Sequence, residues 1–155
     1  MKNKKFKFKY VISACLLGIP CRWDQEKKVN KKAMKIFLQG KALILCPEIM
    51  GNLPTPRPAC ETVNGDGYKV LKGKAKVMDK RGKDYTKFFL KGSKAALKIV
   101  KQHGIKKAIL RANSPTCGTP CIFSGKFDGK KIRGQGVFAA LLKQNGIKII
   151  GLRKK

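Results

Sequence analysis

The stretch Tyr10-Val11-Ile12-Ser13-Ala14-Cys15 decides the fold class of this chain, because it is a short apolar run that ends at a cysteine. From Phe6 onward, the residues that precede the run alternate between lysine and aromatic side chains. Such alternation is typical of a strand with one exposed face. We therefore predict a β-strand over residues 6–14.

Three further apolar runs are interpreted as buried strands, namely Ala42–Leu45, Lys107–Leu110 and Ile147–Leu152. Apolar residues recur at helical spacing in residues 30–39, 85–103 and 136–145, and Asp84 is the expected N-cap of the second of these helices. Strands that alternate with helices at this spacing predict an α/β fold, with a mostly parallel, Rossmann-like sheet flanked by helices. Between them, Tyr68–Leu71 and Lys74–Met78 are interpreted as a small hairpin.

Length and composition favour one domain over residues 1–155, which is long enough to bury a core without disulfides or metal. The hydrophobic fraction of 43% excludes a disordered tail. With 37 Lys and Arg against 8 Asp and Glu, the net charge is +29. This excess indicates either attraction to RNA or other polyanions, or simply lysine at solvated positions.

The N-terminal residues imitate a lipoprotein signal, since Ile12-Ser13-Ala14-Cys15 resembles a lipobox. A signal needs about 7–15 apolar residues before the cleavage site, but only Val11 and Ile12 form a continuous apolar run here. No run approaches the ~18 apolar residues of a membrane span. We therefore expect a cytoplasmic protein without a membrane partner, in which cysteines indicate metal binding or catalysis more often than disulfides.

The positions of the cysteines relative to the predicted strands indicate one shared site. Cys15 directly follows the first strand, Cys46 directly follows the second, and Cys117 lies a few residues past the third. The carboxyl ends of parallel strands share one edge of the sheet, where ligand sites form, so these side chains are expected to converge. Thiolates select zinc, copper(I) or iron–sulfur clusters, and three of them leave one coordination position open.

The motifs around these cysteines resemble those of a known family. In chain order they are Ser13-Ala14-Cys15-Leu16-Leu17-Gly18, Cys21-Arg22-Trp23-Asp24, Cys46-Pro47-Glu48, Leu53-Pro54-Thr55-Pro56-Arg57-Pro58, Ser114-Pro115-Thr116-Cys117-Gly118 and Gly134-Gln135-Gly136-Val137-Phe138-Ala139-Ala140-Leu141-Leu142. They are similar, over about residues 11–150, to the motifs of the thiouracil desulfidase family, formerly a family of unknown function.

The resemblance implies a [4Fe–4S] cluster held by Cys15, Cys46 and Cys117, with the fourth iron free to take the sulfur of the substrate. It also implies catalytic roles for Glu48 and Ser114. The implied substrate is a thiolated pyrimidine, whether thiouracil, a thiouridine nucleotide or a thiolated tRNA base, and its sulfur leaves as sulfide. An open iron would polarise the C=S bond, and Glu48 would take a proton from the attacking water.

Arg57 has two interpretations, a contact to a phosphate or pyrimidine carbonyl of the substrate, or a brace within the proline-rich loop. Arg22 and Asp24 are expected to pair with each other. Cys60 and Cys121 depart from the family's pattern and would be extra thiols near the cluster. Cys121 is close enough to Cys117 in sequence to occupy the fourth iron itself.

Two other functions stay open at this point. The charge of +29 favours an RNA- or polyanion-binding module without catalysis. Cys117 and Cys121, with three residues between them, have the spacing of a zinc pair and favour a zinc or thiol-redox protein. We make no prediction of the oligomeric state.

Overall fold

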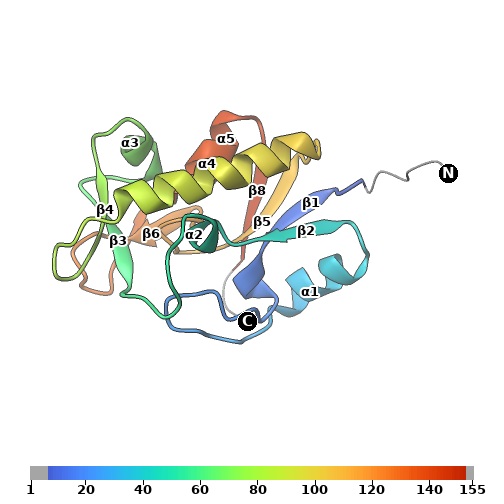
Figure 1. Ribbon diagram of the computed structural model, residues 1–155, viewed down its shortest axis with the longest axis horizontal. Coiled ribbons are helices and arrows are strands. Elements are labelled where there is room, and N and C mark those ends of the chain that lie inside the picture. Colours follow the sequence, from blue (N-terminus) through green and yellow to red (C-terminus); the bar gives the residue numbers. More distant parts are fainter. Residues whose placement is uncertain (1–6, 153–155) are drawn as a thin grey trace.

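A parallel four-stranded sheet forms the centre of the structure, a computed structural model that describes residues 7–152 (Figure 1). Its strands are β1 (Tyr10–Ser13), β2 (Ala42–Leu45), β5 (Lys107–Arg111) and β8 (Lys148–Leu152), in the order β2-β1-β5-β8. All three pairings in this sheet are parallel. The four strands are the four apolar runs of the sequence, so the predicted α/β class is confirmed.

Helices cover the two faces of this sheet, as the apolar spacing predicts. They are α1 (Lys31–Leu38), α4 (Thr86–Gln102) and α5 (Val137–Gln144). Val11 lies in the core cluster under α4 and α5, whereas the next residue, Ile12, lies in the cluster under α1. Successive residues of a strand point to opposite faces of the sheet, so the short apolar run in β1 contributes side chains to the core on each face.

The first strand and the N-cap of α4 differ from their predictions, while the other predicted strands of the central sheet and the three predicted helices differ by at most a single residue at each end. The strand predicted over residues 6–14 spans only Tyr10–Ser13: residues 7–9 precede it without strand pairing, and Phe6 lies outside the described residues. Ala14 already belongs to a short 3₁₀ turn, η1 (Ala14–Leu16). The N-cap position of α4 is Tyr85, but the Asp84 carboxylate still accepts a hydrogen bond from the Thr86 N–H, at 2.8 Å.

The hairpin predicted from Tyr68–Leu71 and Lys74–Met78 is wrong. Residues 67–71 form a helix, α3 (Gly67–Leu71), because the Asp66 carboxylate accepts a hydrogen bond from the Tyr68 N–H at 3.1 Å and caps the first turn. The second segment forms β4 (Lys76–Asp79), which pairs antiparallel with a strand missed by the sequence analysis, β3 (Cys60–Val63). A second missed pair joins β6 (Cys121–Phe123) to β7 (Lys131–Arg133).

The strand order reverses between β1 and β5, so the chain leaves these neighbouring strands toward opposite sides of the sheet. In open α/β sheets such a switch point is where ligands bind, at the carboxyl ends of the strands. In Figure 1, β3, β4 and β6 lie beyond these carboxyl ends. The four-residue helix α2 (Pro47–Met50) follows β2 at the same edge.

Two glycines bring α2 against α4. A Cβ on Gly92 would lie 1.7 Å from the Pro47 carbonyl oxygen, and one on Gly51 would lie 2.1 Å from the Phe88 carbonyl oxygen. Only glycine allows backbones to approach this closely. Among residues 7–152, no helix is long and apolar enough to cross a membrane.

Candidate active site

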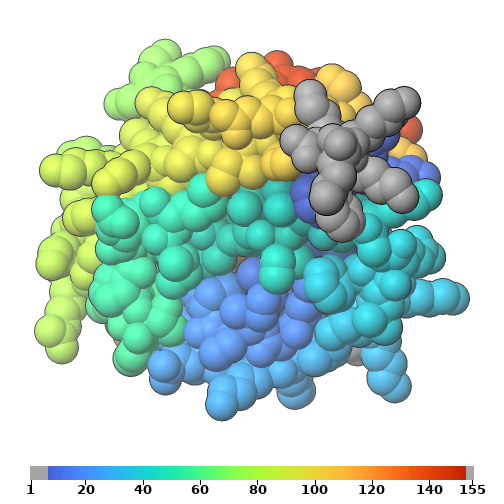
Figure 2. Space-filling view, turned by 45° about the vertical axis from the view of Figure 1, so that its right-hand side comes forward, coloured from blue at the N-terminus to red at the C-terminus, as the bar shows by residue number. Residues whose placement is uncertain are grey.

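A cavity of about 570 Å³ lies at the carboxyl ends of the central strands. This volume is within the usual range for small-molecule sites. The site residues that the sequence singles out all line it, namely Cys15, Cys46, Glu48, Arg57, Ser114 and Cys117. Figure 2 shows how closely the segment after β1 (blue) packs against the segment of α2 and its following loop (teal).

Three different chain segments bring the three predicted ligands to this cavity. Cys15 lies in η1, directly after β1. Cys46 directly follows β2 and takes the N-cap position of α2. Cys117 lies in the loop between β5 and β6 and is 6% exposed. The parallel sheet therefore brings together thiols that are up to 102 positions apart in the sequence (117 − 15 = 102).

The loop that carries Cys117 is fixed by backbone hydrogen bonds to the start of α5. The N–H groups of Val137 and Phe138 donate to the carbonyls of Pro115 and Thr116, at 2.9 and 2.8 Å. The Ser114 Oγ accepts from the N–H groups of Thr116 and Cys117, at 3.1 Å each. The first N–H groups of α5 thus bind the loop that carries Cys117 and hold that loop in place.

A fourth cysteine, Cys21, lies between two of the predicted ligands. Its thiol is hydrogen-bonded to those of Cys15 and Cys46, which raises the pKa of Cys21 far above its ordinary value. The same hydrogen bonds lower the pKa of Cys15 and of Cys46, although burial opposes the shift in both. The Cys21 backbone also takes part, because its carbonyl oxygen accepts a hydrogen bond from the Cys46 Sγ at 3.9 Å.

Cys117 has a different environment. Burial raises the pKa of its thiol well above the usual value, and a hydrogen bond from the Ser13 hydroxyl opposes that shift. The Ser13 Oγ in turn accepts a hydrogen bond from the Arg111 N–H, at 3.1 Å. Ser13 is 3% exposed, so the end of β1 holds a buried hydroxyl against the third thiol.

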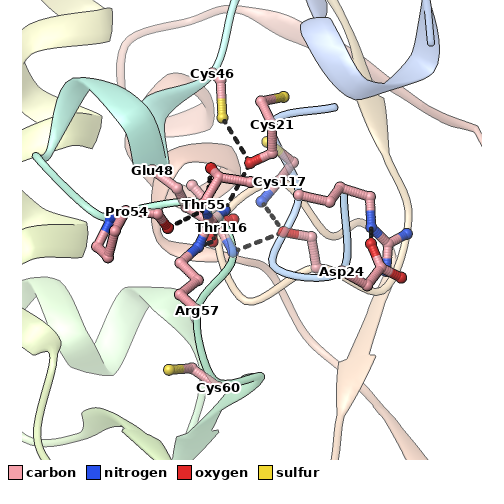
Figure 3. A network of polar contacts seen from close by, with 12 residues as sticks. Cys21, Asp24, Cys46, Glu48, Pro54, Thr55, Arg57, Cys60, Thr116 and Cys117 are labelled. Atoms are coloured by element: carbon pink, nitrogen blue, oxygen red, sulfur yellow. Dashed lines mark hydrogen bonds and ion pairs between the residues drawn. The ribbon is translucent and has the colours of Figure 1, made fainter. Parts of the chain in front are cut away.

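Glu48 stands among these thiols with both carboxylate oxygens bound (Figure 3). Its Oε1 accepts from the Nε and Nη2 of Arg57, at 3.1 and 2.8 Å. Its Oε2 accepts from the Thr116 hydroxyl, at 2.9 Å. Each carboxylate oxygen can accept about two hydrogen bonds, so Oε2 retains room for one more donor.

Arg57 is buried, and all five of its N–H groups donate within the protein. Two go to Glu48, and the others go to the carbonyl oxygens of Pro54 and Cys21 and to the Thr55 hydroxyl. No N–H is left to meet a phosphate or a pyrimidine carbonyl in this arrangement. The structure therefore gives Arg57 the position of a brace for Glu48 and for the loop after β1.

A second ionic network closes the side of the cavity near Cys15. The Oε2 of Glu26 pairs with Arg111 at 2.9 Å and with Arg22 at 3.1 Å. Arg22 also pairs with Asp24 at 3.2 Å, as the sequence analysis expected. The positive charges of Arg111 and Arg22 add to the lowering of the Cys15 pKa.

The two unexpected cysteines are placed differently. Cys60 lines the cavity, and burial together with the charge of Glu48 raises the pKa of its thiol to about 12. Cys121 begins β6 and is not among the residues that line the cavity. Its position thus gives no support to the idea that it occupies the fourth iron.

Both the sequence and the fold of this chain match those of known proteins. The family model for 2-thiouracil desulfurase matches residues 10–152. The chain belongs to this 2-thiouracil desulfurase family. A solved structure described as the [4Fe-4S]-dependent thiouracil desulfidase TudS superposes with a TM-score of 0.82 at 37% sequence identity. The match covers 94% of this chain and 91% of that one.

A second relative extends the family likeness without adding an activity. The uncharacterized protein YbbK of Bacillus subtilis (strain 168) is 41% identical over 140 residues. The alignment covers 90% of this chain and 93% of YbbK.

Sequence reasoning missed two contacts at the site, that of Thr116 with Glu48 and that of Cys21 with Cys15 and Cys46. Thr116 is fully buried, and its hydroxyl reaches Glu48 across 68 positions of sequence. Cys21 was placed in a motif, but its contact with Cys15 and Cys46 was not predicted. The sequence did offer one indication that Thr116 belongs to the site, because Thr116 directly precedes the predicted ligand Cys117 in a motif of the family.

Proposed function

We propose that this protein is a [4Fe–4S]-dependent thiouracil desulfidase. The observation that carries the proposal is the convergence of Cys15, Cys46, Cys117 and Glu48 on one cavity, in a member of the 2-thiouracil desulfurase family. The similarity to TudS, which is described as [4Fe-4S]-dependent, supports the same cofactor here.

The residues present fit such a cluster. The donor set is rich in thiols, the ligand type that iron–sulfur clusters require. In residues 7–152 no three His, Cys, Asp or Glu side chains are arranged to hold a single metal ion. A cubane instead binds each of its cysteines through a different iron. Cys15, Cys46 and Cys117 would hold the cluster, and Cys21 and Ser13 would donate hydrogen bonds to their sulfurs.

When bound, the cluster supplies a soft Lewis-acidic iron that can polarise a thiocarbonyl group. The other parts of the reaction fall to side chains of the chain. Water adds to the thiocarbonyl carbon, the C–S bond breaks, and the sulfur leaves as hydrogen sulfide. One water is consumed for each sulfide released, and no electrons are gained or lost.

Glu48 takes the proton from the attacking water through its Oε2. That oxygen already accepts a bond from Thr116 and has capacity for one further donor. Arg57 and Thr116 fix the carboxylate in one orientation, which a general base needs in order to meet its proton at hydrogen-bond distance. The Ser114 hydroxyl, whose oxygen accepts two backbone N–H groups, has its own proton free to donate toward the substrate.

The test is sulfide release by anaerobically reconstituted protein. We expect brown protein with about four irons per chain that converts 2-thiouracil to uracil and sulfide. Glu48→Gln should keep its iron and lose about 10²–10⁴-fold in turnover, the usual contribution of a general base. Iron-free, colourless protein after reconstitution would overturn the proposal.

We propose the free base 2-thiouracil as the substrate. Larger thiolated pyrimidines should be tested as substrates in the same assay. The charge of +29 is the observation that favours a polyanionic substrate. Thiouridine monophosphate and a thiolated tRNA should therefore be compared with 2-thiouracil at 50 and 200 mM salt. A polyanionic substrate would be turned over with a strong salt dependence, whereas turnover of the free base should change little.

A further inference from the structure

Asn113 lies on the wall of the cavity, directly before Ser114. Its side-chain amide forms no hydrogen bond with any residue in the described part of the chain. The amide therefore offers both a carbonyl oxygen and an NH₂ group to whatever enters the cavity.

The backbone holds this residue in an unusual conformation. Asn113 has a φ of 70°, in the left-handed region, and forms a β-bridge with Ile122. Asn52 and Asn64 have nearly the same φ, at 68° and 69°, but both are exposed and neither lines the cavity. Asparagine tolerates this region in turns, so the backbone explains Asn52 and Asn64 fully. It does not explain why an asparagine lines the cavity at position 113.

Three other polar side chains of the wall are largely engaged in hydrogen bonds within the protein. Arg57 uses all five of its donors. Glu48 accepts on both oxygens. Ser114 accepts two backbone bonds on its oxygen and has only its proton left. Asn113 thus combines an unpaired donor and an unpaired acceptor beside the proposed catalytic residues.

A 2-thiouracil ring presents a matching pair of groups. With the sulfur at C2, the N3–H donor and the C4 carbonyl acceptor stand next to each other on the ring edge. A primary amide can accept from the first and donate to the second, in the bidentate manner by which asparagine reads a nucleic-acid base. We propose that Asn113 reads the N3–H and O4 edge of the pyrimidine and so selects uracil-type rings; this rests on the function proposed above.

The test uses two isomeric substrates, 1-methyl-2-thiouracil and 3-methyl-2-thiouracil, with the cluster-loaded protein. The 3-methyl isomer lacks the N3–H, whereas the 1-methyl isomer retains the whole edge. In the wild type we expect kcat/KM for the 3-methyl isomer to be lower by about tenfold or more, in line with a good bidentate contact.

Asn113→Gly removes the amide while leaving the left-handed backbone unstrained. This variant should raise the KM for 2-thiouracil about tenfold. The ratio of kcat/KM for the 1-methyl isomer to kcat/KM for the 3-methyl isomer should fall close to one. Asn64→Gly makes the same change at nearly the same φ outside the cavity and should keep the wild-type preference. Iron content and the visible spectrum should be unchanged in both variants.

Equal kcat/KM for the two isomers in the wild type would overturn the role of Asn113 while leaving the desulfidase intact. A full preference retained in Asn113→Gly would do the same. If Asn113→Gly fails to retain iron, two other measurements test the role of Asn113. One is the ratio of the kcat/KM values of the two isomers in the wild type. The other is the same ratio in Asn113→Asp, which replaces the NH₂ donor by an acceptor. Absence of sulfide release from either isomer and from 2-thiouracil would contradict the proposed function itself.

Discussion

The guanidinium of Arg57 donates two hydrogen bonds to one carboxylate oxygen of Glu48, with Nε 3.1 Å and Nη2 2.8 Å from Oε1. The same Nη2 also donates to the Cys21 carbonyl, at 2.9 Å. One buried side chain from the proline-rich loop therefore connects the proposed base on α2 with the segment that follows β1. This contact fixes the position of the Glu48 carboxylate relative to the segment after β1, which carries Cys15 and Cys21.

Replacing Arg57 should affect both stability and turnover. Arg57→Ala leaves the Glu48 carboxylate without its counter-charge, so we expect the free energy of unfolding to fall by about 3 kcal/mol. Arg57→Lys keeps a charge but loses the forked geometry, and it should fold better while turning over slowly. Urea unfolding and steady-state kinetics on matched preparations measure the two effects. Wild-type kcat in Arg57→Lys would contradict a positioning role.

The Thr116 hydroxyl is the second brace of Glu48. Thr116→Val is close to isosteric and removes only the hydrogen bond to Oε2, so we expect kcat to fall by about tenfold, equivalent to about 1.4 kcal/mol. Thr116→Ser retains the hydroxyl and should restore most of the rate. Thr62→Val is a matched control, since Thr62 is also buried but its hydroxyl has no hydrogen-bond partner among the described residues. Equal rates for Thr116→Val and Thr116→Ser would exclude this function of the hydroxyl.

Cysteine substitutions should separate the ligands from the other thiols. Serine at position 15, 46 or 117 should abolish both cluster and activity, because each removes one of three anchors. Cys121→Ser should retain both, since Cys121 does not line the cavity. Cys60→Ser is the stricter control, because Cys60 does line it yet is not an expected ligand. Iron content and visible absorbance measure whether the cluster is bound. Loss of the cluster in Cys121→Ser would contradict the assignment of Cys15, Cys46 and Cys117 as the ligands.

Ser13 should tune the cluster through Cys117. Ser13→Ala removes the hydroxyl that is hydrogen-bonded to the Cys117 sulfur, and hydrogen bonds to ligand sulfurs raise the reduction potential of iron–sulfur clusters. We therefore expect a more negative midpoint potential with iron still bound. Ser93→Ala removes another buried serine hydroxyl, on α4, and should leave the potential unchanged. An unchanged potential in Ser13→Ala would show that the hydroxyl has no effect on the cluster.

The central sheet could be predicted because its strands are continuous apolar runs and its helices have clear apolar faces. β3, β6 and β7 are short, and every residue of β7 is exposed, so no apolar pattern marks that strand. Residues 67–71 form a helix because Asp66 caps its first turn, a local contact that the predicted hairpin did not take into account.

The site was predictable to the same extent as the sheet. Strand ends placed Cys15, Cys46 and Cys117 at one edge, since parallel strands share that edge. The environment of Glu48 was not predictable, because it is assembled from Arg57, nine positions away, and Thr116, 68 positions away. Such contacts depend on how loops pack, which no periodicity in the sequence encodes.

The most direct test of the account is the source of the oxygen in the product. Anaerobic, cluster-loaded protein should be incubated with 2-thiouracil in water enriched in oxygen-18, with no electron donor present. We predict uracil that carries one oxygen-18 at C2 and an equal amount of sulfide, because water replaces the sulfur without electron transfer. Uracil without the label, or turnover that requires a reductant, would contradict the proposed hydrolysis.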